Sequence, residues 1–172
     1  AAGVPVSAPI ACGVERGRAD RWFLVTAEAP GEDLSSHLRK SADPAERAAV
    51  MAAAGALLSQ LAGLGFIFQD LVGKHLRVGV HAGIPRIALI DVHRGAFRPA
   101  TLDDRVKMAA NLLATVPAPS LDPASIRSFV AAAFPETDPP PADRLSLALD
   151  ERRRRRRLRR FLLAEADPHL AP

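Results

Sequence analysis

Two aspartates, Asp70 and Asp91, each follow a short apolar run, and this arrangement restricts the fold more than any other feature of the chain. The first run covers residues 66–68 and the second covers residues 87–90. A carboxylate at the end of a buried segment needs a partner, because an unpaired charge is costly to remove from water. Residues 76–80 and 86–90 are typical of strands joined by a turn at 81–85. We therefore expect a hairpin between the aspartates and a site that both of them border.

The remaining elements follow from capping signals and hydrophobic periodicity. Asp43-Pro44 predicts a helix start, with Asp as N-cap and Pro at the first helical position. Apolar residues at 50, 54, 57, 58, 61 and 64 give that helix, expected over 43–64, a core face. Further helices are expected over 34–40, 102–115 (capped by Asp103), 122–133 and 142–163. Upstream, residues 4–11 and 21–26 predict strands separated by a polar turn at 15–20, and residues 27–31 end the second strand.

The composition indicates one domain without disulfides. A chain of 172 residues with 48% hydrophobic side chains can bury a sizeable core. Cys12 is the single cysteine, which excludes an internal disulfide and suits a reducing compartment. No apolar run reaches the roughly 18 residues that span a bilayer, and the first residues do not resemble a signal peptide. A cytoplasmic location is therefore expected.

The net charge of +4 comes from one segment. Eight arginines lie in the run that begins at Arg152 and ends at Arg160, and without them 15 Lys and Arg side chains remain against 19 Asp and Glu. The run therefore describes one surface rather than the whole protein. An anionic membrane surface and a phosphorylated sugar are candidate partners. Nucleic acid is disfavoured because no aromatic residues alternate with the arginines. A solvated tail without a partner is the alternative.

The residues around the two aspartates resemble the lipopolysaccharide kinase family, the Kdo and heptose kinases, within the protein-kinase-like superfamily. Gln69-Asp70 stands where these enzymes have Arg-Asp, His75 stands where protein kinases have Asn, and residues 91–94 (Asp-Val-His-Arg) are similar to the family's Asp-Leu-His-Arg. The resemblance covers about residues 4–134. It implies an α+β, protein-kinase-like fold with a mostly helical C-lobe and the last hairpin of the N-lobe.

The same resemblance divides the chain into three parts. Residues 1–31 would be the end of the N-lobe sheet and the hinge, and residues 32–135 the C-lobe core. Residues 136–172 would be a proline-rich linker and an arginine-rich C-terminal helix.

The resemblance also implies a chemistry for the site. Asp70 would act on the acceptor hydroxyl, and Lys74 beside it would neutralise the transferred phosphate. Asp91 and His75 would hold Mg²⁺, although imidazole suits Mg²⁺ less well than oxygen does. A hydrogen bond from His75 to Asp70 or to a phosphate is the alternative for His75, and a salt bridge to an arginine (Arg94 or Arg98) is the alternative for Asp91.

Contacts with the two substrates are expected on either side of these residues. The hinge that meets the adenine of ATP would be Ala27, Glu28 and Ala29. The acceptor would be contacted by His93 and Arg94. The family's supporting aspartate in the following helix is absent, because Lys107-Met108-Ala109 stands in its place, and Asp103 or Asp104 is expected to replace it.

The function implied by the resemblance is ATP-dependent phosphoryl transfer to a sugar hydroxyl, on a Kdo or heptose residue of the lipopolysaccharide inner core. The enzyme would be cytoplasmic and peripheral at the inner membrane. A non-catalytic kinase-like (pseudokinase) module and a small-molecule kinase of the aminoglycoside or choline kinase type are the alternatives. No glycine-rich loop and no lysine precede Lys40, and the chain does not begin with Met. We therefore expect an N-terminal truncation, or a domain without its nucleotide lid, and slow phosphoryl transfer by this chain.

Overall fold

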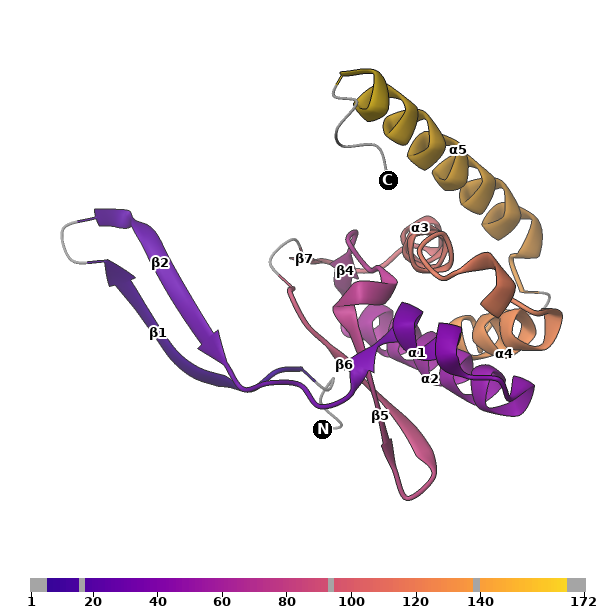
Figure 1. Cartoon of the computed structure of the whole chain (residues 1–172), viewed down its shortest axis with the longest axis horizontal. Coiled ribbons are helices and arrows are strands. Elements are labelled where there is room, and N and C mark those ends of the chain that lie inside the picture. Colours follow the sequence, from indigo (N-terminus) through magenta and orange to yellow (C-terminus); the bar gives the residue numbers. More distant parts are fainter. Residues whose placement is uncertain (1–5, 16–17, 93–94, 138–139, 167–172) are drawn as a thin grey trace.

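Short antiparallel strand pairs alternate with helices along the chain (Figure 1). The computed structural model describes residues 6–15, 18–92, 95–137 and 140–166. The first hairpin pairs β1 (Pro9–Glu15) with β2 (Arg18–Thr26), and Figure 1 shows it extending away from the helical body. Both strands are longer than expected toward the turn, because Glu15 pairs with Arg18 where a polar turn was predicted at 15–20. The strand expected over 4–11 starts later, at Pro9.

A three-stranded sheet lies at the start of the helical body, in the order β3 (Glu32–Asp33), β5 (Leu76–His81), β6 (Ile84–Leu89). The predicted hairpin between the aspartates is therefore confirmed. Its turn is tighter than expected: Ala82 and Gly83 have φ of 49° and 76°, the positive values that a two-residue type I′ turn requires. At the other side, Gly31 has φ of 94°, and a Cβ there would lie 1.9 Å from the carbonyl oxygen of Val78. Only glycine lets β3 approach β5 so closely.

A third strand pair was not predicted. β4 (Phe66–Phe68) pairs antiparallel with β7 (Gly95–Phe97), and the ring of Phe66 lies over Gly95, where a Cβ would be 2.0 Å from the ring. The centroids of the Phe66 and Phe97 rings are 4.9 Å apart. This pair joins the segment before Asp70 to the segment after Asp91, two segments whose pairing depends on the tertiary fold.

The helices begin close to where the capping signals placed them. They are α1 (Leu34–Lys40), α2 (Pro44–Gly63), α3 (Leu102–Leu113), α4 (Pro123–Ala133) and α5 (Ala142–Ala166). Asp43 is the N-cap of α2 as predicted, and Asp122, at the expected start of α4, is the N-cap of that helix. The backbone N–H and the hydroxyl of Ser125 both donate to Asp122, which lowers the pKa of Asp122 to about 2, and Arg47 of α2 donates to the same carboxylate.

The cap predicted at the start of α3 was wrong. Thr101 is the N-cap in place of Asp103, and Thr101 and Asp104 exchange hydrogen bonds in a capping box. A capping box satisfies two of the backbone donors that have no partner within the helix. Thr101 can cap the helix because its hydroxyl reaches the backbone N–H of Asp104.

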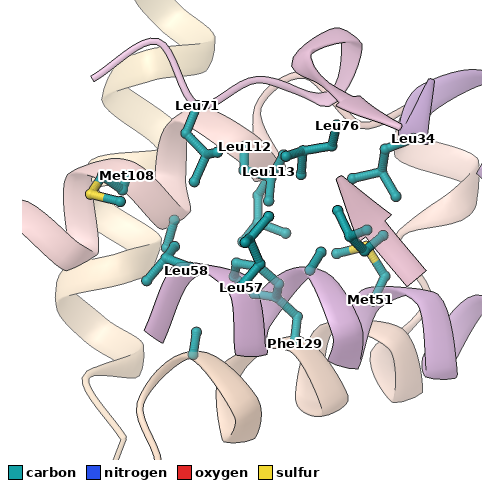
Figure 2. Close-up of a cluster of buried hydrophobic side chains, with 14 of the residues drawn as sticks. Leu34, Met51, Leu57, Leu58, Leu71, Leu76, Met108, Leu112, Leu113 and Phe129 are labelled. Carbon is teal, nitrogen blue, oxygen red and sulfur yellow. The ribbon is translucent and has the colours of Figure 1, made fainter. Parts of the chain in front are cut away.

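The core lies between α2, α3, α4 and the hairpin of β5 and β6 (Figure 2). The expected face of α2 is buried at five of its six positions, whereas Leu64 is 57% exposed because α2 ends at Gly63. Helices α2 and α4 approach closely at Gly55, where a Cβ would lie 2.4 Å from the carbonyl oxygen of Phe129. Phe129 is fully buried. Burial of a side chain of this size stabilises the fold by about 1.5–3 kcal/mol.

The C-terminal helix α5 runs beside α3 (Figure 1). Leu145, near its start, is buried in the core. Among the residues that the structure describes, no helix combines the length and the apolar composition that a membrane span requires.

Candidate functional site

The loop that carries Asp70 is fixed by buried neighbours on both sides. Phe68, at the end of β4, and Leu71 are at most 1% exposed, and the N–H of Leu71 donates to the carbonyl of Phe68 (3.2 Å). This tight turn holds the two apolar side chains in the core while Asp70 between them remains half-buried. The sequence pattern of an apolar run followed by a carboxylate thus produces an anchored acidic side chain at the protein surface.

The end of helix α3 and the turn that follows it support this loop. The side-chain amide of Asn111 donates to the carbonyl of Gln69 (2.6 Å), and the hydroxyl of Thr115 accepts from the N–H of Gly73 (2.7 Å). The carbonyl of Thr115 accepts in turn from Ser35 of α1 (3.1 Å). Sequence reasoning missed Asn111, although a polar residue within the buried face of α3 is a signal that could have identified it.

The expectation that Asp103 or Asp104 supports the loop was therefore wrong. Both oxygens of Asp104 accept from the guanidinium of Arg98 (2.7 Å each), and the hydroxyl of Thr101 donates to one of them (2.7 Å). These bonds hold the pKa of Asp104 well below its usual range. Asp103 faces Arg144 of α5 (3.4 Å). These carboxylates are engaged at the start of α3, whereas the loop is supported from the last turn of that helix.

His75 connects the two aspartate-bearing segments. It ends the 3₁₀ turn η1 (Gly73–His75), and its side chain is only 9% exposed. Its Nδ1 lies 2.8 Å from the backbone carbonyl of Asp70, and its Nε2 lies 3.4 Å from Oδ2 of Asp91. Because a carbonyl can only accept, Nδ1 is the donor in the first contact. One imidazole thus couples the Asp70 loop to Asp91. Its role as a metal ligand stays a prediction.

Asp91 has an unusual backbone conformation. Its φ is 59°, which is uncommon for a residue other than glycine. The carbonyl of His75 accepts from the N–H of Ile90 (2.9 Å), so the chain is held up to the residue before Asp91. The Asp91 side chain is 51% exposed. Left-handed backbone of this kind is often retained at functional sites, where it directs a side chain that a regular strand would not.

Three further residues were predicted to contact the substrates: Lys74, His93 and Arg94. Lys74 is exposed on η1, next to His75. His93 and Arg94, predicted to contact the acceptor, lie outside the described residues.

The predicted hinge lines a hollow of about 360 Å³. Ala27, Glu28 and Ala29 are all in its lining, together with Ile90, which directly precedes Asp91. The hinge residues therefore lie beside the segment that carries the proposed metal ligand. A hollow of this size falls in the range of small-molecule sites.

A second hollow, of about 370 Å³, lies at Asp70. Asn111 contributes to its lining from α3, and three arginines contribute from α5: Arg152, Arg155 and Arg156. No sequence signal could have placed the arginine run there, because its position depends on how α5 packs on α3.

The donor set fits a magnesium ion that is bound chiefly by a nucleotide. The described residues contain no cluster of three or more His, Cys, Asp or Glu side chains that could hold a metal. Mg²⁺ bound with a nucleotide needs only one or two protein carboxylates, because phosphate oxygens and water complete its shell. The half-exposed carboxylate of Asp91 would suit such an ion, and its role as a ligand stays a prediction.

Comparisons with known proteins point to one family. The model of the lipopolysaccharide kinase (Kdo/WaaP) family matches residues 1–132. No curated protein matches. A solved structure described as WaaP in complex with acyl carrier protein is 23% identical, with a TM-score of 0.71, over 88% of this chain and 70% of that chain. The PknI kinase domain of Mycobacterium tuberculosis is 19% identical, with a TM-score of 0.46, over 87% of this chain and 73% of that chain. The predicted α+β, protein-kinase-like fold is confirmed by the family match and the first of these structures.

Proposed function

Because the chain belongs to the lipopolysaccharide kinase (Kdo/WaaP) family, we propose that it transfers a phosphoryl group from ATP to a Kdo or heptose hydroxyl of the lipopolysaccharide inner core. The observation that carries the proposal is the double contact of His75, with the Asp70 loop at Nδ1 and with Asp91 at Nε2. Phosphoryl transfer depends mainly on positioning, so a rigid connection between the acceptor side and the metal side is what the reaction needs.

On the acceptor side, Asp70 orients the hydroxyl and takes its proton as the new P–O bond forms. Its turn is held by Asn111 and by the buried side chains of Phe68 and Leu71, so the carboxylate keeps its position while the acceptor binds. Lys74, exposed on the same loop, attracts the transferred phosphate.

On the nucleotide side, residues 27–29 receive the adenine in the hollow that they share with Ile90. Asp91 would hold Mg²⁺, and Nε2 of His75, 3.4 Å from that carboxylate, forms an ion pair with it when the imidazole is protonated. When bound, Mg²⁺ would neutralise charge that develops on the β- and γ-phosphates. We also propose that His93 and Arg94 contact the acceptor sugar. The protein would be cytoplasmic and would meet this acceptor at the inner membrane.

The test is transfer of radiolabelled γ-phosphate from Mg·ATP to dephosphorylated inner-core oligosaccharide. Single-turnover conditions suit the assay, because transfer by this chain is expected to be slow. We expect Asp70→Asn to reduce the rate by about 10²–10⁴-fold, the usual contribution of a general base. Asp150→Asn is the matched control, since Asp150 is exposed on α5.

Equal rates for the two variants would contradict the role of Asp70. Binding of ATP and oligosaccharide by the unsubstituted chain without any transfer would support the non-catalytic module. Transfer to an aminoglycoside or choline, but not to the oligosaccharide, would support the small-molecule kinase.

A further inference from the structure

Helix α5 is attached to the part of α3 that supports the catalytic loop. The guanidinium of Arg156 donates to the carbonyl of Ala114 (3.0 Å), which is the C-cap of α3. The last carbonyls of a helix lack partners within it and carry partial negative charge, so a cation is favourable there. This contact holds the arginine run beside Asn111 and the Asp70 loop.

The arginines of α5 do not share one environment. Arg152, Arg155 and Arg156 are spaced i, i+3 and i+4, which places them on one face of the helix, and all three line the hollow at Asp70. Arg153 and Arg157 line a neighbouring hollow of about 320 Å³, which shares Ala114 and Arg156 with the first. Arg154 lines neither of these hollows. Among the described arginines of the run, Arg152 and Arg155 thus line only the hollow at Asp70, whereas Arg156 lies between the two hollows.

The face at the site is rich in positive charge. Three guanidinium groups line the hollow, where Asp70 supplies a negative charge, and Arg155 is paired with Glu151. Guanidinium groups bind carboxylates and phosphates through paired N–H donors. A neutral sugar would offer these arginines no charged acceptor, whereas an anionic group would accept from several of their N–H donors at once.

We propose that Arg152, Arg155 and Arg156 form an anion-binding subsite for the acceptor, which holds a carboxylate or phosphate of the sugar next to the hydroxyl that Asp70 activates. This inference rests on the proposed function and extends it to the charge of the substrate. A concave wall beside the catalytic loop fits a sugar-sized anion, because a hollow of about 370 Å³ is within the range of small-molecule sites. A flat membrane surface would instead contact whichever arginines protrude from one side of the helix, whether or not they line a hollow.

The experiment measures binding by NMR titration, with a non-hydrolysable ATP analogue and Mg²⁺ present so that nucleotide phosphate sites are filled. The probes are Kdo as the free acid, its neutral methyl ester, and inorganic phosphate. The test variant combines Arg152→Gln with Arg155→Gln and leaves Arg156 in place, because Arg156 also attaches α5 to α3. The matched control combines Arg154→Gln with Arg157→Gln, which removes the same charge from exposed positions on the same helix.

We expect the test variant to bind Kdo at least about tenfold more weakly, because each charge-assisted hydrogen bond lost is worth that factor or more. The control should bind Kdo as the unsubstituted chain does, and the ester should bind weakly to every variant. The same pattern with phosphate in place of Kdo would support the subsite and identify the anion as a phosphate.

Two outcomes would overturn the subsite. One is equal weakening in both variants, accompanied by equal loss of binding to anionic vesicles, which would identify a diffuse membrane-binding surface. The other is binding of acid, ester and phosphate that no arginine substitution changes. Failure of the proposed function would give a different result. The unsubstituted chain would then bind the acid in preference to the ester but would transfer no phosphate to the oligosaccharide.

Discussion

Replacing Asn111 with alanine tests whether α3 holds the loop that carries Asp70. Asn111 is 7% exposed, and its amide donates to the carbonyl of Gln69 at 2.6 Å, across 42 residues of sequence. Alanine removes the donor and leaves that carbonyl without this partner, at a cost of about 1–3 kcal/mol. For a domain of this size, the melting temperature should fall by about 2–12 °C.

Calorimetry gives the change in melting temperature, and hydrogen exchange shows where the structure opens. We expect faster exchange at the N–H groups of Leu71 and Gly73, since both belong to the loop that Asn111 supports. Phosphoryl transfer should slow as well, because Asp70 would lose its fixed position.

Lys107→Ala is the matched control. It truncates an exposed side chain on the same helix and should change stability by less than about 0.5 kcal/mol. If the Asn111→Ala and Lys107→Ala variants have the same melting temperature, and hydrogen exchange in the Asp70 loop is unchanged, then α3 does not position Asp70.

Three further predictions concern the frame of the site, and each is checked by urea denaturation. Gly31→Ala should lower the free energy of unfolding by more than about 2 kcal/mol, whereas Gly83→Ala should lower it by only about 1–2 kcal/mol. Both glycines have positive φ, but of the two only Gly31 would bring a Cβ against a backbone carbonyl. Equal costs would refute the close approach of β3 to β5. Phe129→Ala should cost about 3–5 kcal/mol, and a value below 1 would mean that α4 does not pack as described. The Arg98 guanidinium lowers the pKa of Asp104 in the folded state, so its stabilisation should be present above about pH 4 and lost as the pH falls from there toward the folded-state pKa. The difference in unfolding free energy between the unsubstituted protein and Asp104→Asn should therefore shrink as the pH falls. A difference that grows in acid would show that the pKa of Asp104 is not lowered in the folded state.

The helices could be predicted from the sequence because their signals are local. Asp43-Pro44 and Asp122-Pro123 each place a cap and a first helical residue side by side, and the bonds that the caps make stay within three residues. The α3 cap was assigned to the wrong residue because Thr101 and Asp103 are both capping types. Which one accepts the bond depends on the conformation of the chain that enters the helix.

The pairing of β4 with β7 could not be predicted in the same way. Each is a three-residue segment, too short to carry a periodic pattern. Their pairing depends on the packing of Phe66 against Gly95 and Phe97, a contact between segments that are far apart in the sequence.

For the candidate site, the sequence by itself determined which groups are available: two carboxylates after apolar runs, an imidazole between them, and a basic helix. Tertiary structure alone decided that His75 touches both aspartate segments, that Asn111 holds the loop, and that one face of the arginine run reaches Asp70. The physical reason is the range of the interactions. Caps and turns are closed by neighbours in the chain, whereas these contacts join distant segments and form only when the helices pack.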